Sequence, residues 1–156
     1  MPISVSSSVA INATEQLVWE VFTDIYRWRE WNPLVLQVVS VAGGTISAPG
    51  GAFVVKYKTD FTPLQATTRS LVQEVIPTRR IVLTGDVLGS QGTMTYDFTP
   101  FGGKTIVSVT EIFAETGSEY QDATISTTTK RLLSIQLDGL KTYVERIGHK
   151  NRRHRC

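Results

Sequence analysis

The chain has 156 residues, of which 41% are hydrophobic and 19% are charged, and its formal net charge at pH 7 is +2. This length and balance are typical of one globular domain that buries a single core. No apolar run approaches the roughly 18 residues of a membrane-spanning helix, and no signal-peptide pattern opens the chain. The small net charge argues against a nucleic-acid partner, and the lone cysteine, Cys156, excludes an internal disulfide. We therefore expect a cytoplasmic protein.

The first third of the chain predicts a strand followed by two helices. Residues 3–11 alternate loosely between apolar and polar side chains, as a strand does. Asn12 suits a helix N-cap with Glu15 at the third helical position, and apolar residues at one-face spacing follow. Asp24 is expected to cap a second, short helix that ends before Pro33. This segment also contains every tryptophan of the chain, namely Trp19, Trp28 and Trp31.

The middle of the chain predicts a series of strands. Aromatic and β-branched residues recur there at a period of two, and glycine pairs or prolines separate the runs. No helical segment lies between them, so the sheet should be antiparallel. The predicted strands cover residues 34–41, 53–57, 66–76, 80–88, 93–99 and 107–113, with a hairpin connection at residues 101–104.

The last element is a long helix from about residue 119 to about residue 149. Its second half carries an unbroken apolar stripe, which should dock on the concave face of the sheet. Its first half is polar on the same face, at Ser126, Thr129 and Lys130, and should face water, a pocket lumen or a ligand. Residues 150–156 are basic and should fray as a flexible tail, which leaves residues 1–149 as one domain. The stripe consists of Leu133, Leu137, Leu140, Val144 and Ile147.

Four segments, together with the order of the predicted elements, resemble a known family. Residues 11–20, 24–33, 102–113 and 140–145 are similar to the helix-grip proteins of the SRPBCC superfamily, which includes StAR-related (START) lipid transfer domains. Within it the chain resembles the polyketide cyclase/dehydrase and lipid transport family. The resemblance implies an α+β fold in which a curved seven-stranded antiparallel sheet, two short helices and a long C-terminal helix enclose a cavity. Residues 11–20 also resemble the opening of bacterial aromatic polyketide aromatase/cyclases, which use a pocket arginine and tyrosine.

The candidate ligand-binding residues are those expected to face this cavity. Trp28 and Trp31 are expected at its mouth, whereas Trp19 should pack the helix on the sheet. Tyr57 and Tyr96 could hydrogen-bond a carbonyl or a phenol of a ligand. The alternative is a filled core, in which the same side chains would pack against each other. The remaining predicted lining residues are Phe53, Val55, Met94, Phe98, Val109, Thr129 and Leu133.

Arg69, Glu111 and Tyr57 are the candidate catalytic residues. Arg69 points inward if Leu71 does, and in the other register of its strand Arg69 is solvated. Glu111 points inward with the alternating valines of the last strand, and a charge placed there must be paired or neutralised. An Arg–carboxylate pair in an apolar pocket could orient a ketone or act as acid and base. The sequence shows no metal-ligand spacing and no motif that requires a cofactor.

These residues leave three classes of function open. The protein could be a binder or carrier of a hydrophobic small molecule, such as a polyketide or a lipid, or it could be an aromatase/cyclase or dehydratase. An interaction module of the co-chaperone-activator type is a third, weaker alternative that shares the fold. Convergent titratable groups deep in the cavity would favour catalysis, and a purely apolar lining would favour carriage. The edge strands of such a sheet would also allow a homodimer.

Overall fold

The computed structural model describes residues 2–42, 46, 48–57, 67–87 and 90–153. Its seven strands form one antiparallel sheet in the order β1-β7-β6-β5-β4-β3-β2. The predicted α+β class, the strands and their antiparallel order are confirmed. The elements are β1 (Ile3–Ile11), α1 (Glu15–Thr23), the 3-10 helix η1 (Ile25–Arg27), α2 (Trp28–Trp31), β2 (Val35–Ala42), β3 (Ala52–Tyr57), β4 (Thr67–Ile76), β5 (Arg80–Val87), β6 (Ser90–Phe101), β7 (Lys104–Phe113) and α3 (Glu119–Arg153).

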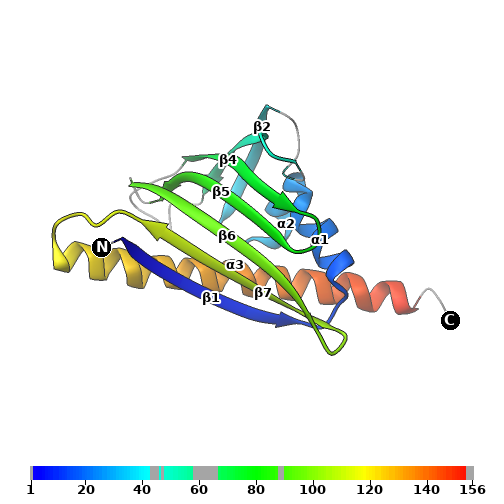
Figure 1. Cartoon of the computed structure of the whole chain (residues 1–156). Coiled ribbons are helices and arrows are strands. Elements are labelled where there is room, and N and C mark those ends of the chain that lie inside the picture. Colours follow the sequence, from blue (N-terminus) through cyan, green and yellow to red (C-terminus); the bar gives the residue numbers. More distant parts are fainter. Residues whose placement is uncertain (1, 43–45, 47, 58–66, 88–89, 154–156) are drawn as a thin grey trace.

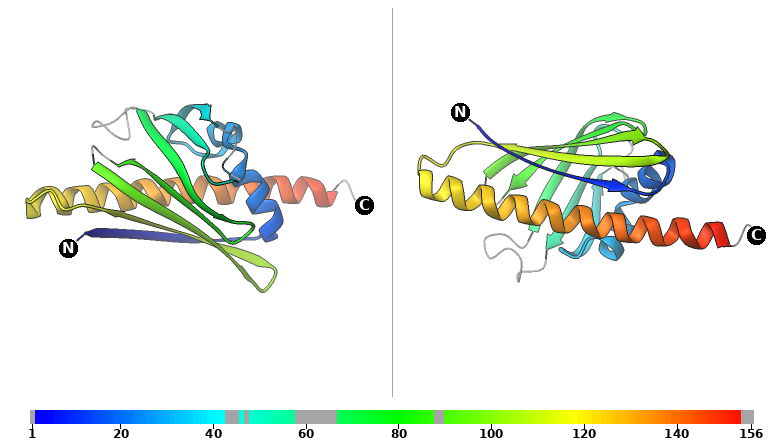
Figure 2. Two further views of the ribbon diagram at one scale, coloured as in Figure 1. Left: turned by 45° about the horizontal axis from the view of Figure 1, so that its top comes forward. Right: turned by 90° about the horizontal axis from the view of Figure 1, so that it is seen from below.

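The long helix α3 lies along one face of the curved sheet, and α1 and α2 lie together near one end of that sheet (Figures 1 and 2). The sheet-facing residues of α3 include the predicted stripe, of which Leu133, Leu137, Leu140 and Val144 are buried. The β6–β7 hairpin turns at Gly102 and Gly103, whose φ angles of 56° and 82° favour glycine. Among the described residues, no helix combines the length and the apolar character needed to cross a membrane.

Three local expectations need correction. The N-cap of α1 is Thr14, whose Oγ1 accepts a hydrogen bond from the Leu17 N–H, and not Asn12. Asp24 precedes η1, but its side chain makes no cap hydrogen bond. α3 continues to Arg153, beyond the end predicted near residue 149, and the flexible basic tail stays a prediction. Residues 154–156 lie outside the described part of the chain.

An aromatic cluster centred on Phe22 of α1 fills the end of the core beside α1 and α2. The Phe22 ring centroid lies 4.6 Å from that of Tyr96, 5.3 Å from that of Trp28 and 5.4 Å from that of Phe98. The Trp28 indole N–H donates to the Phe22 carbonyl oxygen at 2.7 Å, which fixes the ring orientation. Trp19 packs edge-on against Phe98, as expected for a residue that joins helix to sheet.

Side chains of α3 form hydrogen bonds with two backbone carbonyl groups on the free edge of β1. The Lys130 ammonium donates to the Ser6 carbonyl oxygen at 2.7 Å, and the Lys141 ammonium donates to that of Ala10 at 2.9 Å. The Glu145 carboxylate accepts from the Asn12 backbone N–H at 3.0 Å. An unpaired strand edge is a template for another chain, so these bonds close it. The homodimer stays a prediction. If two chains pair through a sheet edge, the edge left for that pairing is β2.

A close approach of backbone to backbone sets the position of α3 over α2. A Cβ atom added at Gly139 would overlap the Trp31 carbonyl oxygen and would lie 2.8 Å from Cδ of Pro33. The same addition at Gly148 would meet only Cδ2 of Leu17 at 3.7 Å, an ordinary contact. The helix can therefore lie this close to α2 only because residue 139 has no side chain.

We expect Gly139→Ala to lower the free energy of unfolding by about 1–3 kcal/mol, because the added methyl pushes α3 off the Trp31–Pro33 segment. The matched control is Gly148→Ala, which should raise that free energy by roughly 0.5–1 kcal/mol because alanine is the better helix former. Urea unfolding followed by circular dichroism measures both. Equal stabilisation by the two substitutions would contradict the close approach at Gly139.

Candidate functional site

Five polar side chains lie between the inner face of the sheet and α3, and we call them the inner polar cluster. They are Tyr57 of β3, Tyr96 of β6, Glu111 of β7, and Thr129 and Gln136 of α3. The Tyr96 hydroxyl donates to Oε1 of Gln136 at 3.0 Å, which joins the sheet to the helix at this point. Burial of polar groups is costly unless the groups are hydrogen-bonded. Asn32, Ser70 and Thr105 are buried as well, but the cluster differs from them because it contains titratable side chains.

Glu111 points inward because β7 alternates without a break. Its odd-numbered residues from Thr105 to Phe113 are all buried, and the register with β1 and β6 shows no shift. Glu111 therefore has Val5 and Met94 as its strand partners, and both are apolar. The inward placement expected from the pattern of valines on this strand agrees with the structure.

The Glu111 carboxyl group is buried without a complete set of partners. The residue is 6% exposed, and its Oε2 atom has no hydrogen-bond partner. Burial raises the pKa of this carboxyl from its ordinary value of 4.5 to about 7, because the charged form loses its hydration. Near neutral pH the group can therefore both give and take a proton.

The two tyrosines of the cluster remain protonated donors. Burial, followed by the nearby Tyr57 and Glu111, raises the pKa of the Tyr96 phenol well above its ordinary value. Burial and the neighbouring Glu111 raise the pKa of the Tyr57 phenol in the same way. Because each of these pKa values responds to Glu111, the two phenols lie within electrostatic range of the carboxyl.

Thr129 lies at the level of Glu111 along the sheet. The next residue of α3, Lys130, bonds the carbonyl of Ser6, which follows Val5, the strand partner of Glu111. The Thr129 hydroxyl is buried, and its Oγ1 atom has no hydrogen-bond partner. Two unpaired oxygen atoms, from a strand and from the helix, therefore belong to the same part of the interior.

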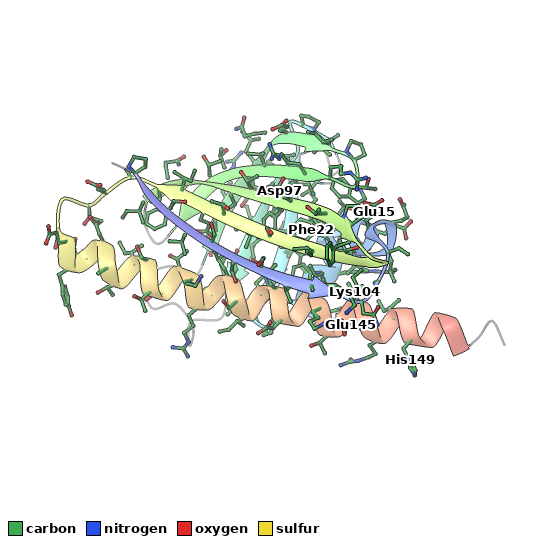
Figure 3. All side chains as sticks on the ribbon, turned by 60° about the horizontal axis from the view of Figure 1, so that its bottom comes forward. Glu15, Phe22, Asp97, Lys104, Glu145 and His149 are labelled. Carbon is green, nitrogen blue, oxygen red and sulfur yellow. The ribbon has the colours of Figure 1, made fainter. Side chains whose placement is uncertain are left out.

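The predicted lining residues face the interior, as expected, but two of them are packed inside the aromatic cluster. Trp28 and Trp31 are each only 2% exposed and pack against Phe22, so they belong to the aromatic cluster and not to an exposed mouth. Phe22 itself lies at the end of the sheet where α1 packs (Figure 3). The other members are buried, at Phe53, Val55, Tyr96, Phe98, Val109, Thr129 and Leu133, or partly buried, at Tyr57 and Met94.

Arg69 does not join the site, and the inward orientation considered for it is wrong. Leu71, which was the guide to its orientation, is 41% exposed, and Arg69 is exposed with it on the outer face of β4. Ser70 and Val72 face inward instead. A β-bulge between Val72 and Glu74 shifts the alternation by one residue, and it lets Val75 face the core as well. The expected Arg–carboxylate pair is therefore absent from the interior.

Sequence reasoning missed Gln136 and Phe22 as members of the site region. Gln136 lies three residues after Leu133, so helical spacing alone would have put it on the sheet-facing stripe. Phe22 had the same signal on α1, where it is one of four buried residues. Their absence from the predicted set comes from treating the stripes as packing surfaces only.

A groove lies outside the core, between α2 and α3. Its volume is about 450 Å³. The Tyr143 hydroxyl donates to Oε2 of Glu30 across it at 2.5 Å. This groove is distinct from the cavity expected beneath α3, which stays a prediction. The groove is lined by Glu30, Trp31, Pro33, Ile135, Asp138, Gly139, Thr142, Tyr143 and Arg146.

We expect Glu111→Gln to change how stability depends on pH. The folded chain holds the Glu111 proton more tightly than the unfolded chain does, so this stabilisation is complete below pH 4.5 and is lost as the pH rises through about 7. The variant should therefore gain up to about 3 kcal/mol relative to the wild type between pH 4.5 and pH 8. Urea unfolding across this range measures the difference. The control is Glu74→Gln on the exposed face of β4, and parallel curves for the two variants would contradict the burial of Glu111.

Comparison with known proteins places this geometry in a family. The sequence model described as polyketide cyclase / dehydrase and lipid transport matches residues 2–145. No curated protein matches the sequence. Several solved structures share the fold at identities below 20%. The Zhui aromatase/cyclase from Streptomyces sp. R1128 has a TM-score of 0.72 and 16% identity, and the match covers 94% of this chain and 95% of that chain.

Two further structures show the same fold. A START superfamily protein from Mycobacterium smegmatis has a TM-score of 0.71 and 14% identity, with coverage of 92% of this chain and 98% of that one. DynU16, a protein in the dynemicin biosynthetic locus, has a TM-score of 0.65 and 19% identity over 91% of this chain, which spans 47% of that protein. With nearly its whole length matched by the family's sequence model, the chain belongs to the polyketide cyclase/dehydrase and lipid transport family.

Proposed function

We propose that this protein binds a hydrophobic small molecule, of polyketide, lipid or similar type, between the inner face of the sheet and α3. The observation that carries the proposal is the buried Glu111 carboxyl with an unpaired oxygen, together with the buried and unpaired Thr129 hydroxyl. Buried polar atoms in proteins nearly always have partners, and those without one call for an explanation. A polar group on a bound molecule would supply the missing hydrogen bonds.

The surroundings of the cluster suit a ligand that is mostly apolar. Aromatic and branched side chains form the inner face of the sheet around it, including Phe53, Val55 and Val109. Each ligand CH₂ group buried among them would contribute roughly 0.8 kcal/mol to binding. The few polar atoms would then fix the orientation of the ligand, a division of roles that is usual in small-molecule sites. Carriage of the ligand needs nothing more than this.

Catalysis is the second candidate, and the pKa of Glu111 near 7 favours it. A carboxyl with such a pKa is well matched to proton transfer at neutral pH. As a base it would take the proton from the carbon next to a ligand carbonyl, while the phenol O–H of Tyr57 hydrogen-bonds the oxygen on which the enolate charge develops. The enolate carbon could then attack a second carbonyl of the ligand, whose π bond opens as the new carbon–carbon bond forms, and the resulting alkoxide would take the proton back from the Glu111 carboxyl, as in an aldol cyclisation. One structural neighbour is an aromatase/cyclase, which supports this alternative at the level of fold.

We expect the wild-type protein to bind naphthylmethanol, a neutral probe that combines a flat apolar ring system with one hydroxyl. Val109→Phe should weaken binding at least about tenfold, because Val109 is fully buried opposite Tyr96 and the larger ring fills the proposed site. The matched control is Ile112→Phe on the exposed face of the same strand. Isothermal titration calorimetry gives the affinities, and circular dichroism checks the fold. Undetectable binding by the wild type, or equal loss in both variants, would refute an interior site.

Proton transfer can be tested without knowledge of the natural substrate. Acetonaphthone exchanges the hydrogens next to its carbonyl slowly in D₂O, and proton NMR follows that exchange. If the site is catalytic, the wild-type protein accelerates the exchange and Glu111→Gln lowers the acceleration by about 10² or more. Glu74→Gln on the exposed face serves as the control. Equal exchange rates with wild type and Glu111→Gln would remove Glu111 from any catalytic mechanism and leave carriage.

A further inference from the structure

We infer that the molecule held by the inner polar cluster is an apolar amine, whose ammonium group pairs with the Glu111 carboxylate. The inference rests on the proposed interior site and goes beyond it by naming the chemical class of the polar end. It follows from the charge of the site, from the acceptors that the site offers and from the rings around it.

When the Glu111 carboxyl is ionised the site carries a negative charge, and no basic side chain among the described residues pairs with it. Burial alone raises the pKa of Glu111, and no described basic side chain offsets it. The cations on neighbouring elements are engaged or directed elsewhere, since Lys130 bonds the Ser6 carbonyl at the sheet edge and Arg69 is exposed on the outer face. A buried carboxylate of this kind is stabilised by a cation, and a ligand could supply one where no described side chain does.

The acceptors of the cluster match the donors of an ammonium group. An ammonium carries up to three N–H bonds, whereas a hydroxyl carries one O–H. Oε2 of Glu111 and Oγ1 of Thr129 are both buried and unpaired, so each can accept one of those bonds. The phenol oxygen of Tyr57, which lies within electrostatic range of Glu111, can accept a third. A neutral alcohol would leave part of this set unsatisfied.

The surrounding rings favour the same charge. The faces of aromatic rings attract cations, and the attraction grows when water is excluded. Tyr96 is fully buried on the inner face, and it lies with Tyr57 within electrostatic range of Glu111. An anionic ligand would meet the opposite situation, because two carboxylates that share a buried site repel each other unless one is protonated.

Three probes with one ring system test the inference on the full-length protein at pH 8, where the Glu111 carboxyl is mostly ionised. They are naphthylmethylamine, naphthylmethanol and naphthoic acid, which carry a cation, a neutral hydroxyl and an anion. Calorimetric titration should show the amine binding at least about tenfold more tightly than the alcohol, and the acid binding most weakly. At pH 7 amine binding should also release protons, detected as a dependence of the heat on buffer ionisation.

Glu111→Gln isolates the cause because it keeps the shape of the side chain and removes its charge. The variant should lose the preference for the amine, so that its affinities for the amine and the alcohol differ by less than about threefold, and the exposed control Glu74→Gln should keep the preference. Equal binding of amine and alcohol by the wild type, or an amine preference that survives in Glu111→Gln, overturns the inference and leaves the interior site in place. Failure of all three probes to bind would overturn the proposed function as well.

Discussion

The contact between α3 and the end of α2 is the constraint on which the rest of the structure depends. At Gly139 the helix lies so close to the Trp31 carbonyl and Pro33 that no side chain fits between them. This contact fixes both the height and the rotation of α3 over the sheet. Gln136 then meets Tyr96, Thr129 comes to the level of Glu111, and Lys130 and Lys141 reach the edge of β1. A missing side chain therefore determines where the polar groups of the interior meet.

The interior combines a well-packed aromatic end with buried polar atoms that are incompletely satisfied. Around Phe22 the rings touch at 4.6 to 6.0 Å, and the Trp28 indole N–H has its partner, whereas the Trp31 indole N–H has none. At Glu111 and Thr129 the packing brings polar oxygens inside without bonding all of them. Proteins commonly accept such a local cost where a site serves binding or chemistry. Among these unpaired groups Glu111 is the titratable one, which makes it the group suited to chemistry.

The sequence was a reliable guide where strands alternate regularly and misleading where they do not. β7 pairs with both neighbours without a shift, so its valines correctly predicted the inward direction of Glu111. On β4 the bulge between Val72 and Glu74 changes which residues face inward. The inward orientation considered for Arg69, which took apolar Leu71 and Val75 as its guide, was therefore wrong. A bulge depends on pairing with another strand, which local pattern does not record. The contact at Gly139 likewise involves segments distant in the sequence, so neither it nor the outer groove could be read from spacing.

The closure of the β1 edge has a consequence for the order of events during synthesis. β1 is made before the other strands of this sheet, yet its partner β7 is the last of them, and the helix whose lysines bond its other edge follows β7. Until β7 and α3 have been made, β1 has neither neighbour, and its exposed backbone groups could pair with other nascent chains. Without α3, the sheet would keep an open edge at β1 in addition to the edge at β2. Two elements that lie far apart in the sequence thus act together, because α3 protects β1 against such pairing.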